Sequence, residues 1–376
     1  MDSTCLVAAD ESGMRAAAAE ALESIVMGVR SEDWEMRVDA AREIRRLTKT
    51  SSRHRLQLAG AIEPLVKMLR EDKKECGEAA ILALLNLAVK DERNKIKIVD
   101  AGALEPLISY LQSTNSNLQG FATAALLTLS AAPINKPIIS SINCIPLLVK
   151  ILKKGNSQAK IDAIVTLYNL STESYNIEII LKSQAISPLV AILNSYKKSS
   201  KIADKCCALL EALLVFDDGR TALTAEEGGV LMLVEVLEEG SLRGREHAVG
   251  ALLTMCESDR NRYREVILRE GVIPGLLELT VHGTQKARCK ARQLLQLLRN
   301  SPYQRSQLEA ETLENIVGNI VSRMDGEDSA GKAKKMLAEM VQVSMEQSLR
   351  HLQQRAVVCI PAEIPVNGCS SEGGLK

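Results

Sequence analysis

The chain has 376 residues with 47 basic and 47 acidic side chains, and only 2% of its residues are aromatic. This charge balance excludes the net positive field that drives non-specific binding to phosphate backbones, and the few aromatic side chains offer little for base stacking. Nucleic acid is therefore not expected as a partner. The 46% hydrophobic content, dominated by Leu, Ala and Ile, favours an all-helical class over a sheet.

Residues 1–5 show no basic-then-apolar secretory pattern. The longest apolar run, 79–89, is far shorter than the ~20 residues that span a bilayer. The nine cysteines include no Cys-x-x-Cys spacing. We therefore expect reduced thiols in an intracellular protein without a membrane segment, located in the cytoplasm, the nucleus or both.

In chain order, residues 1–12 are expected to be a mobile N-terminus, and 13–50 to form N-terminal capping helices. From residue 51 a short motif recurs, first as Ala59-Gly60-Ala61-Ile62-Glu63-Pro64-Leu65. Its glycine position returns every 41 to 44 residues, at Gly60, Gly102, Asn143, Gln184, Gly228 and Gly271. Periods of this length are typical of two- and three-helix solenoid repeats. Residues 51–301 thus contain about six repeats.

Beyond Pro302 the repeat register disappears. Two amphipathic stretches within 302–357 are expected to form C-terminal capping helices, which a solenoid needs to cover its open end. Residues 358–376 are rich in Pro, Gly and Ser without a helical period, and we expect a disordered tail there. The sequence leaves the oligomeric state open.

The repeat that starts at Asn94 shows how each unit divides. Residues 94–99 form a short amphipathic stretch, and Asn94 stands where an N-cap is expected, as do Asn135 and Asn176 in the next two repeats. Gly102 permits the left-handed backbone that ends this first helix. A second helix begins beside a proline tolerated in its first turn, and a third helix follows with a broad apolar face.

This triplet of helices resembles the armadillo repeat, in which a short first helix, a glycine, an Ile-Pro-type second helix and an Ala- and Leu-rich third helix follow one another. The resemblance extends from Gly60 to Leu298. It implies an all-α fold, a right-handed α-solenoid of armadillo repeats with helical capping units at both ends.

One polar position recurs within the apolar third helices, as in Leu84-Leu85-Asn86-Leu87. We call its residues the polar ladder: Arg46, Asn86, Thr128, Asn169, Glu211, Thr254 and Gln296. In armadillo repeats the matching residue is an asparagine that lines the concave groove and hydrogen-bonds the backbone of an extended peptide. Among the seven ladder residues, only Asn86 and Asn169 are asparagines. The alternative is that ladder side chains cap or cross-link neighbouring helices, which we favour for Thr128 and Thr254 and leave open for Asn86 and Asn169.

A second column lies four residues before the ladder: Arg42, Leu82, Ala124, Val165, Cys207, Gly250 and Arg292. In the importin-alpha branch of the family, tryptophans at this column form slots for the lysines of nuclear localisation signals. None stands here, so such cargo is not expected. The predicted partner-binding groove combines both columns and comprises Arg42, Arg46, Asn86, Thr128, Asn169, Glu211, Thr254, Arg292 and Gln296.

These columns are basic toward both ends of the array. Acidic residues lie between these ends, at Asp162, Asp204 and Glu211. Such a pattern suits a ligand with an apolar or basic middle and acidic ends, although charges on solenoid faces often serve only solvation.

No catalytic, cofactor or metal site is predicted. The four histidines are scattered and form no His-Glu-x-x-His motif. The adjacent pair Cys206 and Cys207 is interpreted as core filler, because free cysteine behaves as a small hydrophobe.

The amino-acid sequence of the repeats resembles the armadillo region of plant U-box ubiquitin ligases, especially at Leu87-Ala88-Val89-Lys90-Asp91-Glu92-Arg93-Asn94-Lys95. In that family a U-box precedes the repeats and recruits the ubiquitin-conjugating enzyme; no such domain fits before Met14. We expect a non-catalytic scaffold or adaptor that binds an extended or helical segment of a partner protein. Its expected role is in ubiquitination or in signalling. The alternatives are a ubiquitin-ligase component and a nuclear-transport-type cargo binder.

Overall fold

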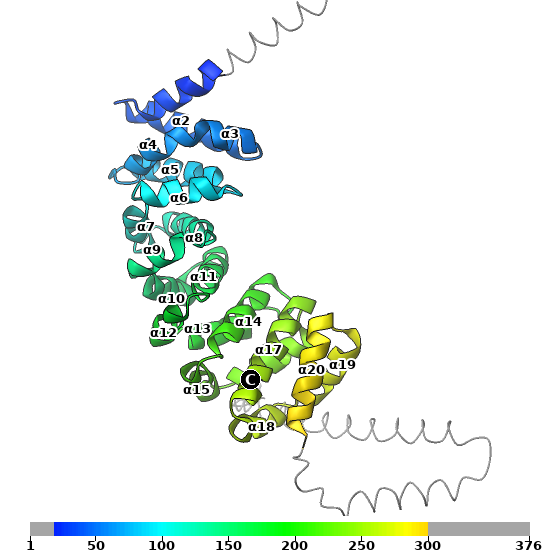
Figure 1. Ribbon diagram of the computed structural model, residues 1–376. Coiled ribbons are helices and arrows are strands. Elements are labelled where there is room, and N and C mark those ends of the chain that lie inside the picture. The colour runs from blue at the N-terminus through cyan, green and yellow to red at the C-terminus, as the bar shows by residue number, and fades with distance from the viewer. Residues whose placement is uncertain (1–18, 300–376) are drawn as a thin grey trace, which may run out of the picture.

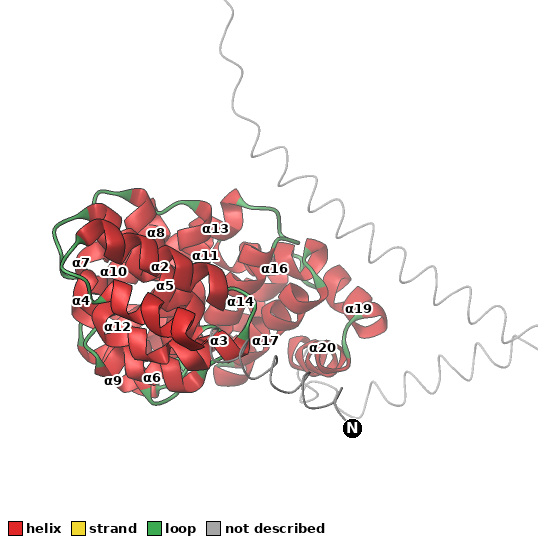
Figure 2. Cartoon of the chain, turned by 90° about the horizontal axis from the view of Figure 1, so that it is seen from above, coloured by secondary structure: helices red, strands yellow, loops and turns green. Residues whose placement is uncertain are grey.

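The computed structural model describes residues 19–299. Residues 19–29 are helical, and the helices α2 to α20 follow them without a strand anywhere in this range (Figure 2). The predicted all-α solenoid is confirmed. The segments predicted at 1–12, 302–357 and 358–376 lie outside the described residues.

The helices fall into three groups that repeat in order. First helices are α3 (Ser52–Gln57) with the 3-10 turn η1 (Leu58–Ala61), α6 (Glu92–Asp100), α9 (Asn135–Ser141), α12 (Ser174–Lys182), α15 (Asp217–Ala225) and α18 (Arg260–Arg269). Second helices are α4 (Ile62–Met68), α7 (Leu104–Leu111), α10 (Cys144–Lys154), α13 (Ile186–Ser195), α16 (Gly229–Glu239) and α19 (Ile273–His282). Third helices are α2 (Trp34–Thr48), α5 (Lys74–Ala88), α8 (Ser116–Ser130), α11 (Ser157–Leu170), α14 (Lys201–Leu213), α17 (Leu242–Ser258) and α20 (Gln285–Leu298).

The third helices stack in chain order, each in contact with the next from α2 to α20. Figure 1 shows an elongated array that bends along its length, with α8, α11 and α14 on the inner side of the bend and α7, α9, α10 and α12 on the outer side. The third helices therefore line the concave face.

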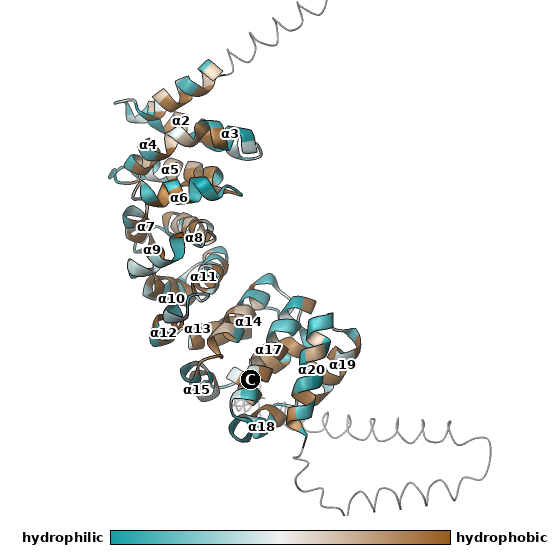
Figure 3. Cartoon of the chain, in the orientation of Figure 1, coloured by the Kyte–Doolittle hydropathy of each residue, from teal (hydrophilic) through white to brown (hydrophobic). Residues whose placement is uncertain are grey.

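Small side chains allow this stacking. Each third helix buries at least one alanine completely: Ala41, Ala80, Ala122, Ala163, Ala203, Ala248 and Ala291. Because alanine adds little bulk, it lets the helix axes approach closely. Cys206 and Cys207 are also fully buried on α14, as the sequence predicts. In Figure 3, hydrophobic residues run along the packed helices, whereas α6 and α18 carry hydrophilic stretches.

Left-handed residues turn the chain between the first and second helices. Gly102, Gly228 and Gly271 have φ of +82°, +69° and +79°, and Asn143 and Gln184 adopt +56° and +60° at the same place. Glycine takes this conformation without a Cβ clash. The first repeat differs because its corner is the 3-10 turn η1, which contains the matching glycine.

The prediction that Asn94, Asn135 and Asn176 are N-caps is wrong. The side chain that caps α6 belongs to Asp91, three residues before Asn94. All three asparagines are buried instead. The Asn94 amide donates to the carbonyls of Leu87 and Arg55, at 3.0 and 3.1 Å.

Asn135 likewise donates to the carbonyls of Leu129 and Lys95, and Asn176 donates to that of Leu170. The carbonyls at the end of a third helix have no partner within that helix, so these amides fasten each first helix to the preceding third helix. Asn94 and Asn135 also reach the previous repeat.

A search of residues 19–299 for membrane spans finds no single helix that is long and apolar enough to cross a bilayer. Taken together, α12 and α13 pass the length and composition test, but they are bent by 76°.

Candidate partner-binding groove

All seven residues of the polar ladder lie on third helices, one per helix from Arg46 on α2 to Gln296 on α20. Arg46 and Gln296 are exposed, and the other five are partly exposed. Since the third helices are stacked on the inner side of the array (Figure 1), the ladder follows one face along its length. We call this surface the third-helix face.

The two ladder asparagines both bond to the preceding third helix. Asn86 Nδ2 donates to the carbonyl of Arg45 at 2.8 Å, and Asn169 Nδ2 donates to Ser130 Oγ at 3.0 Å. The cross-linking role left open by the sequence is therefore present at both positions. A side-chain amide has two N–H donors and an acceptor oxygen, so each contact uses only part of its capacity, and both side chains remain partly exposed.

The two ladder threonines bond within their own helices. Thr128 Oγ1 donates to the carbonyl of Ala124 at 2.9 Å, and Thr254 Oγ1 donates to that of Gly250 at 3.0 Å. This i−4 bond is the usual contact of a threonine in a helix. The hydroxyl hydrogen of each threonine is therefore used within its own helix.

The basic ladder and column residues of α2 have acidic neighbours on the same helix. Arg42 pairs with Asp39 at 3.2 Å, and Arg46 pairs with Glu43 at 2.5 Å. At the other end of the array, Arg292 and Gln296 are exposed on α20.

A surface pocket of about 160 Å³ lies where α2 meets α5. Its lining includes two members of the second column, and the full set is Arg42, Arg45, Glu75, Glu78, Ala79 and Leu82. The amino-terminal end of the third-helix face is thus hollowed, and the pocket is lined by apolar side chains and by side chains of both charges.

Glu211 has a different environment from the other ladder residues. Its carboxylate accepts a hydrogen bond from Lys290 Nζ at 2.6 Å and lies 2.7 Å from His247 Nδ1. Burial raises the pKa of this carboxyl, but the hydrogen bonds from His247 and Lys290 and the positive charge of Lys290 outweigh burial and hold the pKa below its ordinary value. Glu211 is consequently ionised at neutral pH.

Gly250 provides the space for this cluster. It belongs to α17, between Glu211 on α14 and Lys290 on α20. A Cβ atom placed on Gly250 would lie 1.9 Å from Glu211 Oε1 and 2.5 Å from Lys290 Nζ. The ion pair therefore passes directly over the glycine, in the column where the importin-alpha branch carries tryptophan.

The other acidic residues of the middle region also have internal partners. Asp162 is buried and accepts a hydrogen bond from Gln158 at 2.8 Å. Asp204 accepts one from Ser241 Oγ at 2.6 Å, which joins α14 to the start of α17. The charge pattern in the sequence therefore does not translate into a row of free carboxylates along the groove.

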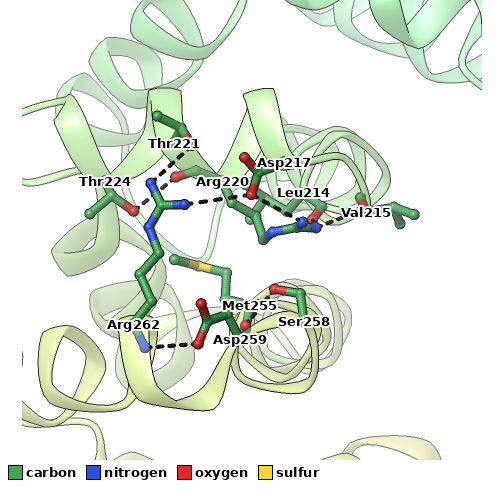
Figure 4. Close-up of polar contacts among 10 residues, drawn as sticks. All are labelled: Leu214, Val215, Asp217, Arg220, Thr221, Thr224, Met255, Ser258, Asp259 and Arg262. Atoms are coloured by element: carbon green, nitrogen blue, oxygen red, sulfur yellow. Dashed lines mark hydrogen bonds and ion pairs between the residues drawn. The ribbon is translucent and has the colours of Figure 1, made fainter.

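Charged contacts also join first helices in the carboxyl-terminal half (Figure 4). Arg262 on α18 reaches Asp217 on α15 at 3.6 Å and donates to Thr221 Oγ1 at 3.1 Å. Arg220 donates to the carbonyls of Leu214 and Val215 directly after α14, at the place where α6, α9 and α12 each use an asparagine. This network lies on first helices, away from the third-helix face.

The sequence predicted Glu211 as a groove residue but missed His247, Lys290 and Gly250 as its surroundings. His247 shares its repeat position with Asp162 and Asp204, and Lys290 stands where most repeats have alanine. Periodicity alone gave no signal that either residue lies beside Glu211. The only available hint was the glycine in the second column. Across residues 19–299, no three His, Cys, Asp or Glu side chains gather as a metal site requires.

Comparisons with known proteins agree with this architecture. A family model of the plant U-box protein ARM repeat region matches residues 135–317, and a model of the kinesin-associated protein matches residues 44–203. The chain is an armadillo-repeat protein related to plant U-box proteins. U-box domain-containing protein 17 of Arabidopsis thaliana is 34% identical over 295 residues, which cover 76% of this chain and 39% of that protein.

U-box domain-containing protein 45 of Arabidopsis thaliana is 31% identical over 264 residues, covering 68% of this armadillo-repeat chain and 34% of the relative. The chain thus spans between a third and two fifths of these two curated relatives. An engineered protein matches the fold with a TM-score of 0.68 at 24% identity, over 88% of this chain and 78% of the other. Computationally designed armadillo repeat proteins for modular peptide recognition match with a TM-score of 0.50 at 20% identity, over 74% of this chain and all of theirs.

Proposed function

We propose that this armadillo-repeat protein is a non-catalytic scaffold or adaptor that binds a segment of a partner protein along the amino-terminal half of its third-helix face. The observation that carries the proposal is the continuous row of partly exposed ladder residues on stacked third helices, with a pocket at its start. The similarity in fold to armadillo repeat proteins designed for modular peptide recognition supports it.

The side chains between α5 and α11 suit a mixed polar and apolar ligand. The ladder supplies Asn86, Thr128 and Asn169, and the second column beside it supplies the partly exposed Leu82, Ala124 and Val165. Amide groups hydrogen-bond a peptide backbone without regard to its sequence, whereas apolar surface contributes about 25 cal/mol per Å² that it buries. A partner segment with apolar side chains on one side and an accessible backbone matches this surface.

The Asn86 and Asn169 amides would serve two purposes in such a complex. The hydrogen bond to the preceding helix fixes the orientation of each amide before a ligand arrives. Because less side-chain entropy is then lost on binding, a pre-oriented group binds more tightly than a mobile one.

We further propose that the role is connected with ubiquitination, and that the protein works in the cytoplasm, the nucleus or both. The relation to plant U-box proteins supports this connection. It is tested by measuring whether ubiquitination of a captured partner in cells changes when the chain is removed and is restored by the intact chain but not by a groove variant.

Binding itself is tested with Ala124→Glu, which places a charge on the partly exposed base of the third-helix face on α8. Ile138→Glu is the matched control, because Ile138 is 42% exposed on the first helix α9. Partners captured from cell extract by the intact chain and by the control, but lost with Ala124→Glu at unchanged helical content, support the proposal. A partner set that survives Ala124→Glu contradicts it.

A further inference from the structure

The Glu211 cluster occupies the part of the third-helix face that adjoins the proposed binding surface. The side chains of Glu211, His247 and Lys290 are 25%, 30% and 28% exposed. They are sheltered enough for their contacts to matter and open enough for a ligand to reach them. Glu211 is the ladder residue of α14, the third helix that follows α11.

The bond from Lys290 has an unusual origin for a solenoid, where contacts are mostly between nearest neighbours. Lys290 belongs to α20 and reaches the ladder residue of α14, two third helices away. It passes over Gly250 on the intervening α17, where even a Cβ would collide with both charged groups. The lysine thus lies across the third-helix face, as the side chain of an external ligand would.

We propose that Lys290 is an internal ligand of the Glu211 carboxylate, and that a lysine side chain of a partner segment replaces it when the carboxyl-terminal half of the face binds. This inference rests on the proposed function, since it takes the third-helix face as the binding surface. A partly buried carboxylate that loses its cation is costly to leave unpaired. An incoming ammonium group therefore binds there only in exchange for Lys290 or in its absence.

The exchange explains how the two halves of the third-helix face differ in the ligands that they bind. From α5 to α11 the ladder side chains are neutral amides and hydroxyls, so a ligand can bind there without displacing a charged side chain. From α14 to α20 the groove already contains an ammonium group in contact with its only ladder carboxylate. A partner must carry its own lysine to extend into this half. Lys290 therefore selects partners by their length and charge.

The test uses a blocked hexapeptide of alternating lysine and serine as the probe, and the same peptide with acetylated lysines as its control. Binding to the full chain is measured by titration for the wild type, Lys290→Met and Lys286→Met. Lys286 is an exposed lysine on the same helix α20, so its removal changes the net charge equally without touching Glu211. The chain contains four histidines, so the imidazole NMR signal of His247, assigned with His247→Gln, reports binding beside Glu211.

We expect Lys290→Met to bind the lysine peptide about tenfold more tightly than the wild type and Lys286→Met, as one hydrogen bond to a charged group allows. The His247 signal should shift on binding, and the gain should vanish in Lys290→Met/Glu211→Gln and with the acetylated peptide. Equal binding by Lys290→Met and the wild type, or a gain that persists without Glu211, overturns the proposal.

If Lys290→Met lowers helical content, Lys290→Gln replaces it, and the wild type is titrated to millimolar peptide. If the His247 signal shifts neither in Lys290→Gln nor in the wild type, the inference is overturned. Because the Ala124→Glu experiment involves only the amino-terminal half, failure here is distinguishable from failure of the proposed function.

Discussion

The middle and the carboxyl-terminal repeats of the solenoid are fastened by different chemistry. From α5 to α12, Asn86 and Asn169 each bond to the preceding third helix, and buried asparagines fasten first helices to third helices. In the carboxyl-terminal half, the corresponding links use charge, as in Glu211 with Lys290 and Arg262 with Asp217. An amide keeps its hydrogen bonds at any ordinary pH and salt concentration, whereas an ion pair does not.

One repeat pattern can therefore support two kinds of surface. Where neutral amides hold the helices together, from α5 to α11, the ladder residues are uncharged and can meet a ligand directly. Where ionic side chains do so, the same face is occupied by its own charges.

The largest effect is expected from Asn94→Ala. Asn94 is buried, and its loss leaves the carbonyls of Leu87 and Arg55 without their donor. We expect the free energy of unfolding to fall by about 2–3 kcal/mol, measured by urea denaturation followed by circular dichroism. Asn86→Ala, which removes one hydrogen bond at a partly exposed site, is the control and should cost about 1 kcal/mol. Equal losses would show that the buried asparagines do not hold the repeats together.

A smaller effect, dependent on pH, is expected from Glu211→Gln. The pKa of Glu211 is lower in the folded chain than in the unfolded chain, so its stabilising contribution is fully present above the unfolded value and is lost as pH falls through the folded value. We expect the substitution to cost about 1–2 kcal/mol at pH 7, with the difference from the wild type shrinking below pH of about 4.3. A difference independent of pH would contradict the ionic description of this half.

The smallest effect is expected from Asp162→Asn on α11, and it has the opposite sign. Burial raises the pKa of Asp162, against the effect of the hydrogen bond from Gln158. The folded chain then holds the proton more tightly than the unfolded chain, so the wild type loses stability as pH rises through this pKa. The substitution should stabilise the chain by about 1 kcal/mol or less at pH 7, and not at low pH. Destabilisation at pH 7 in the denaturation assay would contradict this expectation.

Much of the fold could be predicted from the sequence because its determinants are local. The left-handed corner at Gly102 follows from a glycine at a fixed place, and the third helices follow from their apolar faces. Gly60 escaped this rule, since its corner closes as a 3-10 turn. The ladder positions were also predictable, because one residue per period must lie on one face.

The contacts of the site could not be predicted in the same way. A helix-start asparagine such as Asn94 has the composition of an N-cap, and only the structure shows that Asp91 provides the cap while Asn94 is buried between repeats. The contact between Glu211 and Lys290 joins residues two repeats apart. It depends on how the third helices stack and on the absence of a side chain at Gly250, neither of which a single period reveals.

The most direct test of the central claim compares two tyrosines on adjacent helices. Tyr168 lies on the third helix α11 and is 39% exposed, whereas Tyr175 lies on the first helix α12 and is 48% exposed. Each is replaced in turn by the photoreactive p-benzoylphenylalanine, a similar aromatic side chain, and the chain is irradiated in cell extract. Groove binding predicts partner cross-links from position 168 and few from position 175. Cross-links from 175 alone, or equal yields from both, would contradict it.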